Sequence, residues 1–231
     1  MLRLEEVFIT IKEMVQYFKL NKKDLKIAVQ GFGNAGSNLA QMLWKDNFKV
    51  VAVSDSQGAV FYENGLDVEQ IVKTKANSGS VINFPNGDKI SNEEMLELPV
   101  NVLILAALEN QVTETNASNI QATHIVEIAN GPTTYQADEI LFARNVIVVP
   151  DVLANSGGVI ASYFEWSQNR TGNILDQKYL EERLRQKIIT SWKKVINIRR
   201  KHKNKIDLRT AAYLIAIERI LAAGKLRGYL K

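Results

Sequence analysis

Three glycines near the start of the chain have the spacing of a phosphate-binding turn. Gly31, Gly33 and Gly36 follow a short apolar run and open an amphipathic segment. In such a turn the first glycine lets the chain bend, the second lets the backbone approach a pyrophosphate, and the third lets helix and strand pack closely. The amides that begin the following helix then face the phosphates. The chemistry predicted for this stretch is the binding of a dinucleotide, with a plain structural turn as the alternative.

An acidic residue follows the turn at the distance that a bound ribose requires. Asp55 ends the next apolar run, at about the 20 residues typical of such units. Its carboxylate can accept hydrogen bonds from both ribose hydroxyls and would repel a 2′-phosphate, and Gln57 adds no positive charge to offset this. The sequence therefore favours NAD as the cofactor and leaves NADP open.

The elements that would position these residues alternate between strands and helices. Apolar runs typical of buried strands cover residues 25–30, 49–54, 102–107, 124–128 and 146–149, and helical patterns lie between them. We predict an α/β fold with a doubly wound, Rossmann-type parallel sheet and helices on both faces. Beyond Pro150 only helical patterns occur, over about residues 157–168, 175–203 and 208–225, with Gly224 or Gly228 as the C-terminal cap.

Local signals refine this plan. Apolar residues at helical spacing predict an amphipathic packing helix within residues 1–24, which leaves residues 25–231 as one dinucleotide-binding domain with a helical tail over residues 157–231. Ser91 with Glu94 predicts a capped helix, and Thr133 or Thr134 is expected to cap another. The pair Asn86-Gly87 indicates a hairpin or turn.

Composition excludes several kinds of protein. The 231 residues are 46% hydrophobic and 23% charged, enough for a sizeable core, and they include no cysteine and only two histidines. Disulfides and thiolate metal sites are excluded, and no metal centre is expected. No apolar run approaches the roughly 18 residues of a membrane span, so we expect a soluble cytoplasmic protein. The net charge of +4 is concentrated near the end of one predicted helix, where it suits the helix dipole, and no nucleic-acid partner is expected.

Taken together, six blocks of sequence resemble a known family. They are QGFGNAGSNLA, VVAVSDSQG, ILAALENQVT, EIANGPTT, VVPDVLANSGGVIASYFEWSQN and LRTAAYLIAIERILAAGKLRGYL. In this order they resemble the C-terminal, cofactor-binding domain of the glutamate dehydrogenases, within the glutamate, leucine, phenylalanine and valine dehydrogenase superfamily. SYFEWSQN is more similar to the glutamate enzymes than to the others. The resemblance implies oxidative deamination of L-glutamate to 2-oxoglutarate and ammonia, with hydride transfer to the nicotinamide.

The resemblance also implies roles for individual residues. The pyrophosphate turn would be formed by Gly31, Phe32, Gly33, Asn34, Ala35 and Gly36. The adenosine ribose would meet Asp55 and Ser56, while the ribose and nicotinamide side would meet Ala106, Ala107, Asn110, Asn130 and Asn155. Val159, beside Gly158, and Ser162 would face the substrate. Without the resemblance, Asn130 fits a turn, Asn155 fits a helix start, and Ser162 fits a close approach of two helices.

No catalytic residue is assigned to this chain. In the family that the sequence resembles, the catalytic lysine and aspartate come from an N-terminal substrate domain, and no matching segment is legible here. Lys73, Lys75 and Asp151 have no spacing that makes a proton relay and are interpreted as surface or structural residues. We therefore expect the chain to bind NAD but to act on glutamate or 2-oxoglutarate only when a substrate domain is supplied. The alternative is a noncatalytic NAD-binding sensor or regulatory subunit, acting as an oligomer or in association with a full-length enzyme.

Overall fold

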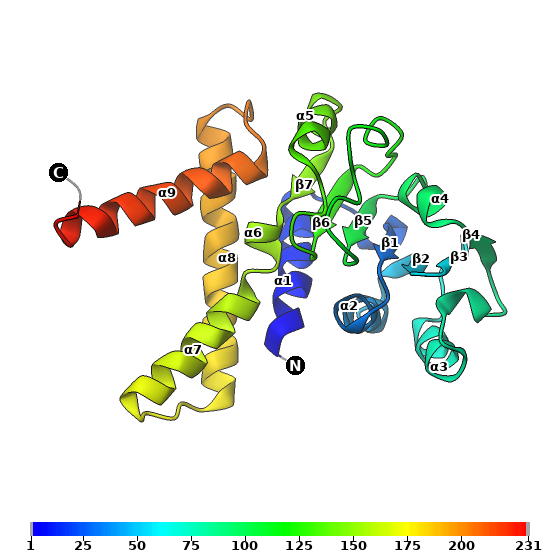
Figure 1. The fold of residues 1–231 in the computed structure, drawn as a ribbon, viewed down its shortest axis with the longest axis horizontal. Coiled ribbons are helices and arrows are strands. Elements are labelled where there is room, and N and C mark those ends of the chain that lie inside the picture. Colours follow the sequence, from blue (N-terminus) through cyan, green and yellow to red (C-terminus); the bar gives the residue numbers. More distant parts are fainter. Residues whose placement is uncertain (1, 230–231) are drawn as a thin grey trace.

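A seven-stranded sheet organises the chain (Figure 1), whose computed structural model describes residues 2–229. Three terminal residues lie outside the described residues, namely Met1, Leu230 and Lys231. The predicted range 1–24 begins with the first of them, and the predicted range 25–231 ends with the other two. The strand order is β4-β3-β2-β1-β5-β6-β7. The strands are β1 (Lys26–Gln30), β2 (Lys49–Asp55), β3 (Gly58–Phe61), β4 (Asp88–Ile90), β5 (Val102–Leu105), β6 (His124–Glu127) and β7 (Ile147–Val149).

The predicted doubly wound α/β sheet is confirmed, and one side of it adds two antiparallel strands that the sequence did not predict. Strands β2, β1, β5, β6 and β7 run parallel as predicted, but β3 and β4 are antiparallel to their neighbours. The chain reverses at Ser56 and Gln57, so that Asp55 pairs with Gly58. Two residues suffice for an antiparallel hairpin but leave no room for the crossover that a parallel strand needs. Asn86-Gly87 precedes β4 as a turn and does not join two paired strands.

Helices cover both faces of the sheet, as predicted. They are α1 (Leu2–Tyr17), α2 (Asn34–Lys45), α3 (Val68–Ser78), α4 (Asn92–Leu96), α5 (Tyr135–Ala143), α6 (Asp151–Ala154), α7 (Gly157–Thr171), α8 (Gln177–Lys201) and α9 (Leu208–Leu226), with short 3-10 turns η1 (Lys22–Asp24) and η2 (Val81–Asn83). Alternate residues of β5 separate the two cores: Val102 and Ile104 pack with α1, α2 and α8, while Leu103 and Leu105 pack with α4 and α5.

Caps define the ends of several helices. Ser91 and Glu94 form a reciprocal capping box at the start of α4, as predicted. Of the two threonines considered for α5, Thr134 is the cap, since its side chain accepts a hydrogen bond from the Ala137 amide. Gly228, with φ of +72°, follows the last turn of α9, whereas Gly224 lies inside the helix. Helices α4 and α5 thus start where a side-chain oxygen accepts hydrogen bonds from free backbone amides. Helix α9 ends where a glycine can adopt a left-handed conformation.

The predicted amphipathic helix near the N-terminus is α1, and it belongs to the main core. Its residues Val7, Ile11 and Met14 are almost completely buried, and α1 packs against α2, α7 and α8. The rings of Tyr17 and Trp192 meet edge to face, with 6.3 Å between their centroids. Helix α1 therefore holds the tail helix α8 against the parallel strands.

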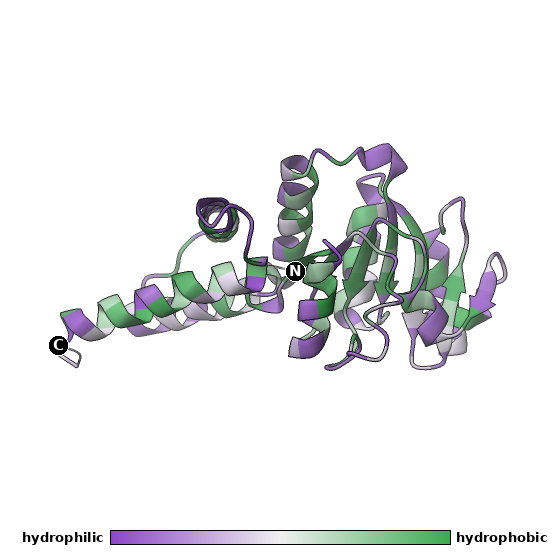
Figure 2. Ribbon diagram, turned by 90° about the horizontal axis from the view of Figure 1, so that it is seen from above, coloured by the Kyte–Doolittle hydropathy of each residue, from purple (hydrophilic) through white to green (hydrophobic). Residues whose placement is uncertain are grey.

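Helix α9 begins at the sheet and then extends away from it (Figure 2). Its large apolar side chains are exposed, namely Tyr213, Leu214, Ile217, Ile220, Leu221 and Leu226. On α7, Val159, Tyr163 and Trp166 are exposed as well. Among the described residues, no helix is long and apolar enough to cross a membrane.

Candidate functional site

The glycine turn lies at the centre of the sheet, between β1 and β5. From β1 the parallel strands continue in opposite directions, to β2 on one side and to β5 on the other, and ligands of open α/β sheets bind at such a reversal beyond the carboxyl ends of the strands. Gly31 has φ of +87°, and a Cβ there would lie 2.7 Å from the Ala106 carbonyl and from the Ala107 amide nitrogen. The structure therefore brings together the predicted residues Gly31, Ala106 and Ala107. Position 31 must be glycine, because no other residue fits this space and conformation.

The other two glycines differ in their surroundings. A Cβ on Gly36 would lie 1.8 Å from the Gly31 carbonyl oxygen, so this glycine permits close packing of α2 on the turn. A Cβ on exposed Gly33 would meet no atom within 4 Å. Asn34 and Ala35 follow as the first residues of α2, where amides lack partners within the helix. The turn thus combines a rigid base with an open rim of amides, which fits a pyrophosphate.

Phe32 contributes backbone rather than side chain to this turn. Its ring is only 2% exposed and belongs to the core beneath the sheet edge. Its amide donates to the Ser54 carbonyl at 2.6 Å, and its carbonyl accepts from the Lys75 ammonium at 3.0 Å. The phenylalanine anchors the turn to β2 and leaves contact with a ligand to its neighbours.

Asp55 lies at the carboxyl end of β2 and is fully hydrogen-bonded. Oδ1 accepts from the Gln57 amide at 3.0 Å and from the Ser80 hydroxyl at 2.9 Å, and Oδ2 accepts from the Val81 amide at 2.9 Å. The Lys75 ammonium completes the set, at 3.1 Å from Oδ2. Burial alone would raise the pKa of Asp55, but the hydrogen bonds from Val81, Gln57, Lys75 and Ser80 outweigh it, so the pKa is lowered and the group is an anion.

Lys75 makes a contact that the sequence did not reveal. Its ammonium bridges the Asp55 carboxylate and the Phe32 carbonyl, which connects the glycine turn to the acid at the end of β2. The sequence analysis interpreted Lys75 as a surface or structural residue. Helical spacing placed Lys75 in the last turn of α3 but carried no signal about what it faces. Ser56, by contrast, is exposed in the hairpin turn after Asp55.

Three predicted asparagines from separate loops converge on the other side of the reversal. The Asn110 amide donates to the Gly131 carbonyl at 2.9 Å, which joins the loop after β5 to the loop after β6. The Asn155 side chain donates to Asn130 Oδ1 at 2.8 Å and to the Ile128 carbonyl at 3.0 Å. Asn110, Asn130 and Asn155 therefore form one wall, although they are up to 45 residues apart in the sequence.

The two predicted substrate residues lie on α7. Val159 is 75% exposed and lines a hollow between α6, α7, α8 and α9, together with Asn155. Ser162 is also exposed on α7 but does not line that hollow. The structure thus brings Val159 to the asparagine wall and leaves Ser162 one helical turn further along.

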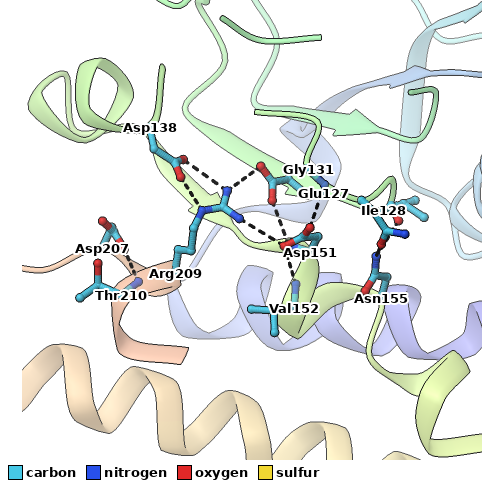
Figure 3. A network of polar contacts seen from close by, with 11 residues as sticks. Glu127, Ile128, Gly131, Asp138, Asp151, Val152, Asn155, Asp207, Arg209 and Thr210 are labelled. Atoms are coloured by element: carbon cyan, nitrogen blue, oxygen red, sulfur yellow. Dashed lines mark hydrogen bonds and ion pairs between the residues drawn. The ribbon is translucent and has the colours of Figure 1, made fainter. Parts of the chain in front are cut away.

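Behind the asparagine wall lies a charged cluster that the sequence did not predict (Figure 3). Arg209, in the first turn of α9, contacts Glu127 at the end of β6, Asp138 on α5 and Asp151 on α6. The distances are 2.7 Å from Nη2 to Glu127 and 3.2 Å from Nη1 to Asp151, and Nε donates to Asp138. Burial raises the pKa of both Glu127 and Asp138, against the opposing effect of the guanidinium.

Glu127 and Asp151 connect this cluster to the wall. Glu127 Oε2 accepts from the Asp151 amide at 2.9 Å, and Asp151 Oδ2 accepts from the Gly131 amide at 2.8 Å. The sequence interpretation of Asp151 as structural agrees with these contacts. A charged residue at the end of an otherwise apolar run was the one signal for Glu127, and nothing in the sequence paired it with Arg209. Among the described residues, no group of three or more metal-ligating side chains has the arrangement of a metal site.

Comparison with known proteins identifies the family of this chain. The family model described as glutamate/leucine/phenylalanine/valine dehydrogenase matches residues 6–228. The chain belongs to this family. It is 40% identical over 224 residues to a cryptic catabolic NAD-specific glutamate dehydrogenase of Bacillus subtilis, covering 97% of this chain and 52% of that one. It is also 40% identical over 230 residues to an NADP-specific glutamate dehydrogenase of Synechocystis, with 96% and 53% covered.

A solved relative has the same fold. The hetero-hexameric glutamate dehydrogenase of Thermus thermophilus superposes with a TM-score of 0.87 at 29% identity, covering 98% of this chain and 53% of that one. The chain therefore spans about half the length of the dehydrogenases it matches. The predicted resemblance to the cofactor-binding domain of glutamate dehydrogenases is confirmed in two respects. The family model matches the chain, and the chain corresponds to about half of a glutamate dehydrogenase.

Proposed function

We propose that this chain is the NAD(P)-binding half of a glutamate dehydrogenase. The observation that carries the proposal is the turn at the reversal of the sheet, where Gly33 is open, Gly31 and Gly36 are tightly packed, and Asp55 ends the neighbouring strand. When bound, the nicotinamide would accept hydride from glutamate during oxidative deamination to 2-oxoglutarate and ammonia. The residues of this chain would hold and orient the cofactor.

Each group of residues has a separate binding task in this proposal. Amides of Gly33, Asn34 and Ala35 would face the pyrophosphate, because the N-terminus of a helix attracts anions. Asp55 would face the adenosine ribose. The asparagine wall would face the nicotinamide and its ribose, with Val159 and Ser162 toward the substrate.

The choice between NAD and NADP depends on Asp55 together with Lys75. The acid favours a free ribose 2′-hydroxyl, and its lowered pKa keeps it charged at neutral pH. The ammonium of Lys75, 3.1 Å away, offsets part of that charge. We propose a preference for NAD that Lys75 moderates, so that NADP still binds measurably. Relatives of this chain include both NAD-specific and NADP-specific enzymes.

We further propose that the chain alone turns glutamate over slowly or not at all. Proton transfer at the substrate's alpha carbon requires a positioned acid or base, which contributes about 10²- to 10⁴-fold in rate. The site described above contains no residue to which we assign this role. A substrate-binding half, as long again as this chain in its relatives, would supply it.

The test is a fluorescence titration with NADH alongside a glutamate-dependent NAD reduction assay. We expect saturable binding of NADH and little or no turnover. Gly33→Asp should abolish binding while leaving the fold intact, since its side chain meets open space but places a negative charge at the phosphates. Asn47→Asp is the matched control, because it adds the same charge beyond the other end of α2.

Each measurement contradicts a different part of the proposal. Absence of NADH binding by the wild-type chain would overturn the cofactor site. Robust glutamate-dependent turnover without any added protein would overturn the claim of inactivity. Equal binding by Gly33→Asp and Asn47→Asp would show that the phosphates lie elsewhere.

A second candidate function is a noncatalytic NAD-binding sensor or regulatory subunit. The observation that favours it is the group of exposed apolar side chains on α9, since large exposed apolar patches mark surfaces that bind other proteins. The Thermus thermophilus relative is described as a hetero-hexamer, in which unlike subunits assemble. Size-exclusion chromatography with a full-length homologous glutamate dehydrogenase tests this candidate. Co-elution and a change in the partner's activity would support it, and separate elution would count against it.

A further inference from the structure

Arg209 is the centre of a buried network that no binding task has so far explained. Its side chain is 18% exposed, and the carboxylates of Glu127, Asp138 and Asp151 that surround it are 0%, 13% and 18% exposed. These acids come from β6, α5 and α6, whereas the arginine comes from α9 (Figure 3). A guanidinium carries five N–H donors in a fixed planar fork, so it can hold three acids in one arrangement. The arginine thereby fixes four elements relative to one another.

Two of the acids transmit this constraint to a loop backbone. Glu127 accepts from Arg209 with Oε1 and from the Asp151 amide with Oε2, at 2.7 Å and 2.9 Å. Asp151 accepts from Arg209 with Oδ1 and from the Gly131 amide with Oδ2, at 3.2 Å and 2.8 Å. The Gly131 carbonyl in turn accepts from the Asn110 amide. The peptide groups of Gly131 therefore connect the buried arginine to the loop after β5.

The same loop carries Asn130 and is held from its other side by Asn155. The Asn155 side chain donates to Asn130 Oδ1 and to the Ile128 carbonyl. Residues 128–131 are thus fixed between Asn155 and Asp151, and Asp151 is oriented by Arg209. We propose that Arg209 is a positioning residue that sets this loop for the nicotinamide-ribose half of the cofactor, an inference that rests on the proposed function.

The adenosine half of the site has separate supports. The partners of Asp55 come from the β2–β3 turn, α3 and η2, whereas those of Arg209 come from β6, α5 and α6. A change at Arg209 should therefore alter binding of the nicotinamide end and leave the adenosine end unchanged. ADP, which lacks both the second ribose and the nicotinamide, measures the adenosine end alone. Comparing its affinity with that of NADH separates the two.

The experiment measures the dissociation constants of NADH and ADP for the wild-type chain and for Arg209→Lys. Lysine keeps the charge but offers a single ammonium in place of the fork. We expect NADH affinity to fall about tenfold and ADP affinity to stay within about twofold, because misplaced contacts cost binding only where they are made. Amide hydrogen exchange at Gly131 should accelerate in the variant, since its acceptor Asp151 is no longer oriented. Arg144→Lys is the control, since Arg144 donates to the Ala117 carbonyl, away from this loop.

A second variant keeps the inference testable if Arg209→Lys does not fold. Asp151→Asn retains one acceptor oxygen but places an N–H group toward either Arg209 or the Gly131 amide, both of which are donors. It should give the same selective loss of NADH affinity. A merely structural role predicts instead that both affinities fall together as the folded fraction falls.

The outcomes distinguish this inference from the proposed function. If the wild-type chain binds neither ligand, the proposed function fails. If it binds NADH no more tightly than ADP, the nicotinamide and its ribose make no contact, and the role of Arg209 is overturned while the adenosine site stands. A folded Arg209→Lys variant that loses both affinities equally, or neither, also overturns the positioning role.

Discussion

Two charged clusters lie at the carboxyl ends of the parallel strands, and they are built in opposite ways. At Asp55, one carboxylate receives four hydrogen bonds, from two amides, a hydroxyl and an ammonium. At Arg209, one guanidinium is shared by three carboxylates. The first cluster has more donors than a single acid needs, and the second has more negative charge than a single cation neutralises.

The consequence is an opposite effect on protonation. Burial disfavours the charged form of both sets of acids, but only Asp55 has enough donors for its pKa to be lowered. For Glu127 and Asp138 burial outweighs the arginine, and their pKa values are raised. The comparison teaches that four donors hold Asp55 as a fixed anion, whereas Arg209 and its three acids bind one another and hold the loop that contains Gly131.

The largest expected difference between the clusters is in the free energy of unfolding after the cation of each is removed. Arg209→Met leaves three buried acids without a partner, and we expect it to lower the free energy of unfolding by about 3–5 kcal/mol. Lys75→Met leaves Asp55 with its other donors, and we expect a loss of about 1 kcal/mol. Urea denaturation of both variants at pH 7 measures this. Similar losses for the two would show that the clusters are not built differently.

The glycines of the turn provide the next contrast, within the adenosine end itself. Gly36→Ala brings a Cβ to 1.8 Å from the Gly31 carbonyl oxygen, so we expect about 1–3 kcal/mol of destabilisation. Gly33→Ala meets open space, and we expect stability within about 0.5 kcal/mol of the wild type and a clear loss of NADH affinity. Thermal unfolding and NADH titration of both variants decide this. Normal NADH binding by Gly33→Ala would show that the phosphate does not bind at this position.

The pH dependence of stability should have opposite signs at the two ends. Ionised Asp55 contributes stability above its ordinary pKa of 3.8, and this is lost as the pH falls. Neutral Glu127 contributes stability below its ordinary pKa of 4.5, and this is lost as the pH rises through its raised value. Each tenfold change in proton affinity corresponds to about 1.4 kcal/mol.

Two variants isolate these effects in urea denaturation, from about pH 2 to 5 for Asp55→Asn and from about pH 4 to 8 for Glu127→Gln. The stability difference between wild type and Asp55→Asn should grow with rising pH, and that between wild type and Glu127→Gln should shrink. Asp138 and Glu127 share Arg209 in both proteins, so the titration of Asp138 enters both curves. Slopes of the same sign would contradict the comparison.

Cofactor discrimination is the smallest expected effect. Lys75→Met removes the cation that offsets Asp55, so NADPH affinity should fall about fivefold more than NADH affinity, equivalent to roughly 1 kcal/mol for a partly buried ion pair. Asp55→Ala should shift the ratio in the other direction. Fluorescence titration with both cofactors measures the ratios. An unchanged NADH to NADPH ratio in Lys75→Met would show that this lysine has no part in selectivity.

Local pattern was sufficient for the parts of this molecule that depend on neighbours in the sequence. Glycine spacing, apolar runs and caps such as Ser91 and Thr134 identified the turn, the parallel strands and most helices, because these depend on backbone freedom and on one buried face. The antiparallel strands were missed, since β3 and β4 are short, β3 follows a two-residue turn, and β4 joins the sheet only after α3 and η2. The resemblance added the candidate site residues, among them Asn130 and Asn155, which pattern alone left as a turn residue and a helix-start residue.

Only the tertiary structure decided which charges meet. Lys75 lies 20 residues from Asp55, and Arg209 lies 82 residues from Glu127, so no local periodicity pairs them. Their contacts follow from the order of the strands and from the docking of α3 and α9 on the sheet edge. The sequence by itself determined that a glycine turn and an acid at the end of the next strand are present, because helix starts and glycine turns are local. Packing over long distances settled how Asp55 and Arg209 are held, since burial and the number of available donors set the pKa shifts of Asp55, Glu127 and Asp138.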